Sequence, residues 1–434
     1  MTTTLEKLDD RFYVTLLSNF ARGYDKYARI YSKQAIPESR HPGLFFLLTR
    51  DDIGIGIKKT ASLMARKGKA GDRMIAIRSS LSSNLLHPNT TTGLGEVIAR
   101  DWVDVRSLCW VDNAGLGAEV SVEEAYAASL LLHRAELASY ESLRPRTVSV
   151  LPVAVSCEAA CRFCFSKASA SVDQAVGAPD MGRVREVLLA AKTAGAERAV
   201  ITGGGEPGML DPLVLRELAG TCSGQFDKVV LITNGYFLSK RTSELSALHQ
   251  AGVEVLAVSR HHHDPDRNAA LMRLRTCSED LPALVRRSPG IKLRWICVLQ
   301  KGGIDSENEL CAYLSWAARN GVSEICFKEL YVSTTQESVY HSRPANEWSA
   351  CHQVPLRLIL DFASDHGWSE VSRLPWGAPV FRGRWEGAPM QIAAYTEPSL
   401  FWERSNGICR SWNLMADGRC LASLEDRRSE VPAT

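Results

Sequence analysis

Three cysteines in one short loop are the residues of this 434-residue chain best suited to chemistry. Cys157, Cys161 and Cys164 lie in the segment SCEAACRFC, directly after a predicted strand. A structural zinc ion needs four protein ligands, usually as two separated pairs, and no second pair follows within reach. A [4Fe–4S] cluster held by three cysteines leaves one iron open for a substrate or a cofactor. The triplet therefore favours such a cluster, and structural zinc is the alternative.

Alternating strand and helix patterns place this loop within a larger fold. Apolar, β-branched runs predict strands at residues 147–156, 198–202, 229–233, 253–259, 292–299 and 324–330. Helical periodicity predicts helices between them at 181–195, 213–219, 239–250, 265–287 and 306–319. Such an order implies right-handed crossovers and a parallel sheet or an incomplete barrel. We expect an α/β fold with an incomplete (β/α)6 TIM-type barrel, whose chemistry lies at the strand C-termini.

The patterns change on both sides of this region, which predicts three parts. Residues 1–146 form an accessory or substrate-related N-terminal domain, with helical patterns at 12–32 and 122–144. Residues 147–330 form the barrel core. Residues 331–434 form an α+β cap over its mouth, with a helix at 347–366 and then short strands rich in Pro, Gly and Trp.

Further motifs follow the later strands. Gly204-Gly205-Glu206-Pro207 follows the second strand, Thr233-Asn234-Gly235 closes the third, Ser259 closes the fourth, and Val298 lies near the end of the fifth. With Cys-x-x-x-Cys-x-aromatic-Cys on the first loop, where Phe163 is the aromatic residue, these motifs resemble the radical S-adenosylmethionine (radical SAM) superfamily. The resemblance covers about residues 147–330, with the motifs in the family's order.

The resemblance implies a set of roles. The three cysteines would hold the cluster, and the backbone of Gly204 and Gly205 with the Glu206 side chain would contact the amino end of S-adenosylmethionine. Further cofactor contacts would come from Asn234, Ser259, Arg260 and Val298. Ser259 would meet the ribose, and Val298 belongs to the segment that packs on the adenine.

The resemblance also implies a reaction. A reduced cluster cleaves S-adenosylmethionine, and the resulting 5′-deoxyadenosyl radical abstracts a hydrogen atom from a substrate. We expect a small biosynthetic intermediate as that substrate. The alternatives are a maturase that modifies a ribosomal peptide, with the N-terminal domain as leader binder, and a non-catalytic binding protein stabilised by zinc.

Several neighbouring features allow two interpretations. The run 203–208 also satisfies GxGxxG, with Asp227 about twenty residues on, but Pro207 interrupts the turn of a dinucleotide site. His261, His262 and His263 could bind a metal or form a polar loop in which one of them, or Arg260, touches the cofactor or the substrate. On the sixth strand, alternation sends Lys328 to the face opposite Phe327 and Glu329, either into the cavity or into an ion pair.

Two C-terminal cysteines are candidates for catalysis. Cys409 or Cys420 could return a hydrogen atom to a substrate radical, or both could be buried apolar residues. The surrounding segment resembles that of radical SAM enzymes with an auxiliary cluster, but Ser423 stands where a further cysteine would be expected. The remaining cysteines are expected at core positions: Cys109, Cys222, Cys277, Cys297, Cys311, Cys326 and Cys351.

Composition limits the partners. The 51 basic and 49 acidic side chains give a net charge of +2, so no overall field favours nucleic acid or an anionic membrane. A basic stretch at residues 58–78 could dock an acidic electron donor such as a flavodoxin or ferredoxin, or be a solvated surface. Residues 1–10 lack the apolar core of a signal peptide, and the apolar runs 44–48 and 130–132 are too short to cross a membrane. We therefore expect a cytoplasmic protein.

Overall fold

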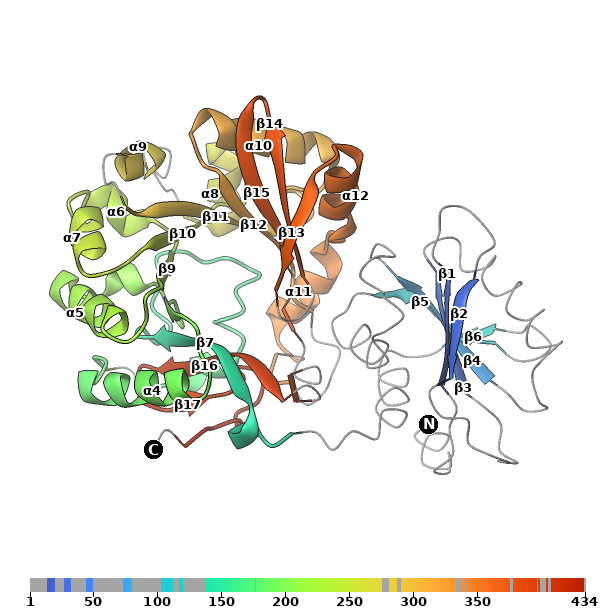
Figure 1. Ribbon diagram of the computed structural model, residues 1–434, viewed down its shortest axis with the longest axis horizontal. Coiled ribbons are helices and arrows are strands. Elements are labelled where there is room, and N and C mark those ends of the chain that lie inside the picture. The colour runs from blue at the N-terminus through green and yellow to red at the C-terminus, as the bar shows by residue number, and fades with distance from the viewer. Residues whose placement is uncertain are drawn as a thin grey trace. The chain divides into compact units, whose positions relative to one another are not determined.

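The computed structural model describes residues 138–432, apart from 176, 275–280, 287–289, 333–337, 341, 375–377, 396, 399–402 and 405–406, and six strands nearer the N-terminus (Figure 1). The chain divides into two compact units. One comprises Met1–Glu136 with Ser333–Thr335, and the other comprises Leu137–Val332 with Gln336–Thr434. None of the helices among the described residues has the length and the apolar character needed to cross a membrane.

The first unit contains a six-stranded mixed sheet. Its order is β2-β1-β3-β4-β5-β6, formed by β1 (Val14–Asn19), β2 (Tyr27–Ser32), β3 (Leu44–Thr49), β4 (Arg73–Ser79), β5 (Val103–Val111) and β6 (Gly117–Glu119). The helix predicted at residues 12–32 is wrong, because β1 and β2 pair there as antiparallel strands. Periodicity alone does not distinguish a short apolar run that forms a strand from one that forms a helix. The helix predicted at 122–144 lies mostly outside the described residues, and its end holds only a 3-10 turn, Tyr140–Ser142.

The second unit is built on six parallel strands that are neighbours in chain order. They are β7 (Arg144–Leu151), β8 (Ala199–Ile201), β9 (Val229–Thr233), β10 (Val255–Ser259), β11 (Lys292–Leu299) and β12 (Glu324–Glu329). All six predicted strands are confirmed. The first is shorter than predicted, since Pro152 has no N–H group to continue the pairing of β7. Residues 152–156 lead instead toward the first cysteine.

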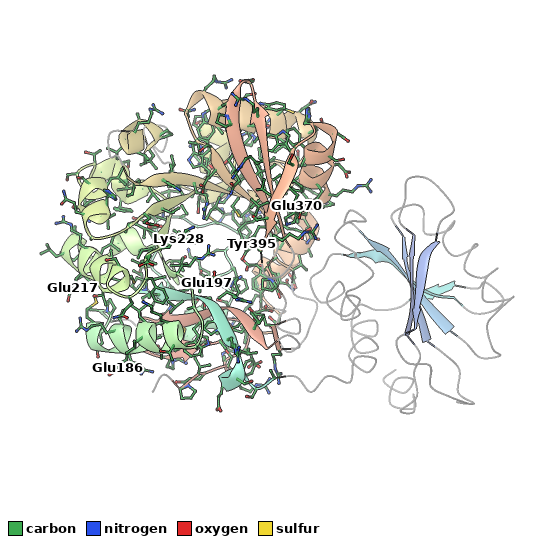
Figure 2. All side chains as sticks on the ribbon, viewed as in Figure 1. Glu186, Glu197, Glu217, Lys228, Glu370 and Tyr395 are labelled. Carbon is green, nitrogen blue, oxygen red and sulfur yellow. The ribbon has the colours of Figure 1, made fainter. Side chains whose placement is uncertain are left out.

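Helices cover the outer side of this parallel sheet (Figure 1). They are α4 (Met181–Thr193), α5 (Pro212–Ser223), α6 (Tyr236–Lys240), α7 (Glu244–Gln250), α8 (Pro265–Met272), α9 (Leu281–Arg286) and α10 (Glu307–Arg319). Apolar residues such as Leu188 and Leu218 are fully buried under α4 and α5, whereas Glu186 and Glu217 point outward from the same helices (Figure 2). The helix predicted at 239–250 is two helices, α6 and α7. The one predicted at 265–287 is interrupted after α8, where Arg273 takes a left-handed conformation.

The C-terminal region extends the sheet at both of its ends. Strands β13 (Ser369–Arg373), β14 (Pro379–Trp385) and β15 (Ala388–Tyr395) continue it beyond β12, and β16 (Ile408–Met415) and β17 (Cys420–Leu421) continue it beyond β7. The helix predicted at 347–366 is divided into α11 (Pro344–His352) and α12 (Arg357–Asp365), and Pro355 lies in the break between them.

The row of strands from β12 to β16 curves until its ends come together. Five strands separate β12 from β16 in the sheet, yet Lys328 on β12 and Arg410 on β16 both form ion pairs with Glu397. One side chain therefore bridges the two ends. The wall of the enclosed interior includes an apolar cluster of Val200, Val230, Ile232, Val255, Ala257 and Ile296.

Candidate functional site

Two glycines of the segment after β8 hold the chain that leads to the cysteine loop. Gly205 N donates to Val153 O at 2.8 Å, and Glu206 N donates to Ser156 O at 2.8 Å. A Cβ atom on Gly204 would lie 2.2 Å from Ala154 O, and one on Gly205 would lie 2.0 Å from Ser156 O. Only glycine permits this approach of two backbones. The predicted GGEP segment is therefore packed directly against the residues that precede Cys157.

The Glu206 carboxylate joins the motifs that follow β8 and β9. It accepts hydrogen bonds from Thr233 Oγ1 at 2.5 Å, Asn234 N at 2.8 Å and Gly208 N at 2.9 Å. Burial raises the pKa of Glu206 to about 7, against the effect of these three donors. Both carboxylate oxygens have partners within the protein, so Glu206 positions the turn after β9. Its predicted contact with the cofactor stays a prediction.

The turn after β9 and the end of α8 contact the cysteine loop from two further sides. Asn234 Nδ2 lies 3.8 Å from Cys157 Sγ and 3.2 Å from a carboxylate oxygen of Glu158. Met272 O, at the C-terminus of α8, accepts from Ala160 N at 3.0 Å and lies 3.6 Å from Cys161 Sγ. Segments after β7, β8, β9 and β10 therefore meet around the cysteines.

The three thiols have the chemistry of metal ligands. All three are free and partly exposed. Burial, and then the proximity of Cys164 and Cys157, raises the pKa of Cys161 to about 12, so thiolates here require a neighbouring cation. Two sulfur ligands of one zinc ion lie no more than about 4.6 Å apart, given zinc–sulfur bonds of about 2.3 Å. Among the described residues, two other groups have three ligand atoms within 4.8 Å of one another, and the cysteine triplet is not among them.

His261 connects the cysteine loop with β11. Its ring lies edge-on to Phe163 of the cysteine motif, with the ring centroids 5.1 Å apart, and its Nδ1 accepts from Val298 N at 3.1 Å. Burial lowers the pKa of His261 to about 3, so the imidazole is neutral and its proton is on Nε2. Ser259 precedes this histidine by two residues. The structure thus brings the loops that carry Phe163, Ser259 and Val298 together, as the predicted cofactor site requires.

Arg260 points in another direction. Its side chain is buried, lies 4.6 Å from the ring centre of Trp316 on α10, and donates to His262 O at 2.8 Å. Trp316 stacks on Trp295, which belongs to the helix-covered face of β11. This placement argues against the predicted cofactor contact of Arg260. Its side chain instead connects the loop after β10 with helix α10.

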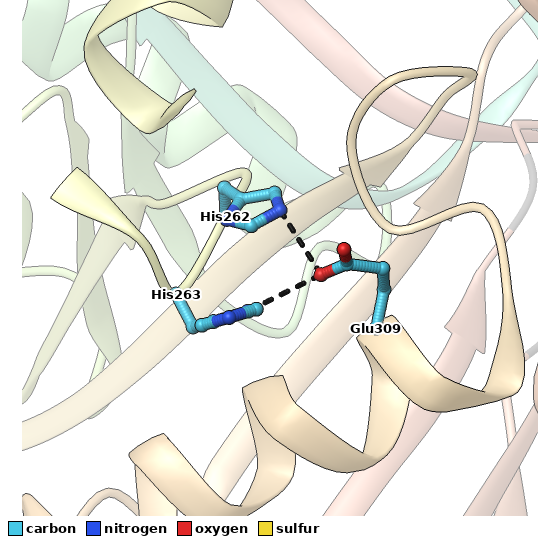
Figure 3. A group of neighbouring side chains, drawn as sticks. All are labelled: His262, His263 and Glu309. Carbon is cyan, nitrogen blue, oxygen red and sulfur yellow. Dashed lines mark ion pairs between the residues drawn. The ribbon is translucent and has the colours of Figure 1, made fainter. Parts of the chain in front are cut away.

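The other two histidines meet Glu309 of α10 (Figure 3). Glu309 Oε2 lies 3.2 Å from His262 Nε2 and 3.7 Å from His263 Nδ1. However, His262 Nδ1 accepts from Asp264 N at 2.9 Å, so the proton of the neutral ring is on Nε2. A metal ion at Nε2 would need the lone pair that this proton occupies. The group therefore anchors the loop after β10 to α10, and the geometry disfavours the interpretation as a metal site.

The two C-terminal cysteines are fully buried. Cys409 pairs with Pro145 at the start of β7, the end opposite the cysteine loop, and Cys420 pairs with Leu414. Burial raises the pKa of Cys420 to about 12 and that of Cys409 further above its ordinary value. This favours the buried, apolar interpretation, and their role in catalysis stays a prediction. Of the remaining cysteines, Cys351 is exposed, so its predicted core position is wrong.

Three further interpretations from the sequence concern the glycine run, Lys328 and the basic stretch. The helix after the glycine run begins only at Pro212, which disfavours a dinucleotide site. Lys328 forms the ion pair considered for it, with its Nζ 2.5 Å from Glu397 Oε1, and Phe327 and Glu329 are buried on the other face. The basic stretch at 58–78 lies outside the described residues, except for the backbone at the start of β4.

A small cavity beside the cysteine loop contains residues that the sequence did not single out. Tyr331 OH donates to a Glu425 carboxylate oxygen at 2.6 Å, and Phe165, next to Cys164, lies edge-on to Tyr331. No local sequence motif marks the residues of this cavity. Several of them lie on β16, which reaches the site only because it pairs with β7. The polar and aromatic wall of the cavity includes Phe165, Tyr331, Arg410, Ser411, Asn413 and Glu425.

The family model of the radical SAM superfamily matches residues 151–281. No curated protein matches the chain. Among solved structures, SuiB of Streptococcus suis bound to precursor peptide SuiA is 15% identical, with 70% of this chain and 64% of that chain covered and a TM-score of 0.41. Coproporphyrinogen III oxidase (HemN) from Escherichia coli is 12% identical, with 52% and 54% covered and a TM-score of 0.34. The chain thus spans less than two thirds of either protein, and these similarities are too weak to assign a substrate.

Proposed function

We propose that this chain, whose residues 151–281 match the radical SAM superfamily, is a radical SAM enzyme in which Cys157, Cys161 and Cys164 hold a [4Fe–4S] cluster that binds S-adenosylmethionine. When bound, the two cofactors supply a 5′-deoxyadenosyl radical that takes a hydrogen atom from the substrate. The observation that carries the proposal is the convergence of four strand ends on the cysteine loop. It is supported by the three free, partly exposed thiols at this point of convergence.

The residues of this chain would orient and shield that chemistry. Asn234 Nδ2, close to Cys157 Sγ, would donate to the sulfur and adjust the potential of the cluster. The backbone at Gly204 and Gly205, together with Glu206, would fix the surface for the methionine part of the cofactor. Ser259 and Val298 would meet its ribose and adenine. The apolar wall of the interior would exclude water from the radical.

We further propose that the curved sheet works as an incomplete barrel at residues 147–330, with 331–434 as its cap and 1–146 as an accessory domain. The substrate would be a small biosynthetic intermediate, and a ribosomal peptide is the alternative. We expect the enzyme to act in the cytoplasm, where a flavodoxin or ferredoxin would deliver the electron.

The test is anaerobic reconstitution with iron and sulfide, followed by dithionite and S-adenosylmethionine. We expect about four irons per chain and the formation of 5′-deoxyadenosine. Replacement of any one of the three cysteines by Ala should remove the visible absorption of the cluster, whereas Cys351→Ala, at an exposed cysteine, should keep it. One zinc ion without sulfide would support the non-catalytic alternative. An intact cluster that never yields 5′-deoxyadenosine would refute the mechanism.

A further inference from the structure

A carboxylate is bound between a cation on β12 and a cation on β16. Glu397 Oε1 lies 2.5 Å from Lys328 Nζ, and Glu397 Oε2 accepts from Tyr395 OH at 3.0 Å and pairs with the Arg410 guanidinium. Lys328 Nζ also lies 4.9 Å from the centre of the Tyr395 ring. A lysine, an arginine and a phenol therefore surround one carboxylate, with donors toward both of its oxygens.

This group lies on the inner side of the sheet and lines the small cavity described above. Lys328 is on the face of β12 opposite Phe327, whose ring packs against Tyr313 of α10. Glu397 and Arg410 line the small cavity whose wall includes Phe165, the residue that follows Cys164. A ligand held by the two cations would thus share a cavity with Phe165, at the end of the cysteine loop.

The two cations favour an anion at this position. Burial, and then the charge of Arg410, lowers the pKa of Lys328 to about 8, and a counter-charge stabilises the charged form of the lysine. Glu397 is the acid that satisfies both cations. It belongs to the connection between β15 and β16 and not to a strand of the sheet. A second carboxylate could make the same contacts, because the donors are already oriented and largely desolvated.

We infer that Lys328 and Arg410 form the binding site for a carboxylate group of the substrate, which takes the place of Glu397. This inference rests on the proposed function, because it assumes that the interior beside the cysteine loop receives a substrate. It narrows the substrate class to molecules that carry a carboxylate. Glu397 acts as an internal competitor, and the Tyr395 hydroxyl supplies a third donor.

The test uses succinate as the probe, with isothermal titration calorimetry on the full-length, cluster-loaded protein under anaerobic conditions. Glu397→Gln keeps the size of the side chain but removes the competing charge, so succinate should bind about tenfold more tightly, or better, than to the unchanged protein. In the double variant Lys328→Met with Glu397→Gln, this gain should be lost. Glu186→Gln, on the exposed face of α4, is the matched control and should bind as the unchanged protein does (Figure 2).

A gain in succinate affinity in Glu397→Gln that is lost in the double variant indicates a binding site. The loss of a structural ion pair would instead lower the stability of both variants alike. No succinate binding by Glu397→Gln, with a melting transition and iron content like those of the control, would overturn the inference. Inorganic phosphate is titrated in parallel, and binding of phosphate alone would overturn the assignment to a carboxylate. The proposed function fails separately, if the unchanged protein forms no 5′-deoxyadenosine.

Discussion

Replacement of Gly205 by Ala tests whether the contact between two backbones controls the cysteine loop. The new Cβ atom would lie 2.0 Å from Ser156 O, while real contacts of this kind are essentially never under 3.0 Å, so the segments must separate by about 1 Å. That shift strains the hydrogen bonds Gly205 N to Val153 O and Glu206 N to Ser156 O, each worth about 1 kcal/mol. With overpacking, we expect a loss of about 3 kcal/mol in the free energy of unfolding.

The effect on function should exceed the effect on stability. Cys157 follows Ser156 directly, so a displacement of about 1 Å moves a proposed cluster ligand, and misplacement by this distance can lower a rate about 100-fold. The assay is the rate of 5′-deoxyadenosine formation together with iron and sulfide per chain. Gly220→Ala is the matched control, since nothing lies within 4 Å of its new Cβ and α5 gains about 1 kcal/mol in helix propensity. A Gly205→Ala enzyme with full iron content and an unchanged rate would refute the reasoning.

Two further substitutions test the surroundings of the site. The pKa of Glu206 is raised from 4.5 to about 7, so between these pH values the folded protein holds a proton that the unfolded chain releases. The contribution of Glu206 to the free energy of unfolding should therefore fall by about 3 kcal/mol as the pH rises from 4.5 to 7. Urea unfolding of Glu206→Gln beside the unchanged protein should show a difference that varies with pH in this way, and a constant difference would contradict the shift. Glu309→Gln should lower stability by about 1 kcal/mol, and zinc should leave the melting temperature of both proteins unchanged; a rise with zinc in the unchanged protein alone would restore the metal interpretation of His262 and His263.

The parallel core was predictable because its signals are local. Strands β9 and β11 end where the apolar runs end, and the cysteine, GGEP and TNG motifs all follow strands. Since the C-terminal ends of parallel strands share one edge, motifs distant in sequence were expected to meet. The bridging role of Glu206 was not predictable, because it depends on the directions of Thr233 Oγ1 and two backbone N–H groups in the folded loop.

The features that the sequence did not predict depend on information that local patterns lack. The segments of β1 and β2 are short apolar runs, and only their pairing with each other makes them strands. The place of β16 beside β7 depends on contacts between distant parts of the chain, and with it the cavity wall formed by Arg410, Ser411 and Asn413. Arg260 follows Ser259 in sequence, but its side chain leaves the site because Trp316 and two carbonyl oxygens receive it on the outer side.

The pairing of β16 with β7 has a consequence for how the protein is made. Ser411 and Ser149, which are hydrogen-bonded across these strands, are separated by 262 positions in the chain. At a synthesis rate of about 5–20 residues per second, the free edge of β7 waits roughly 10–50 s for its partner. An unpaired strand edge invites association with other chains during that time. The cavity wall that β16 contributes is completed only when synthesis has passed β16, so we expect chaperones to protect the nascent core and the proposed cluster to be loaded after synthesis.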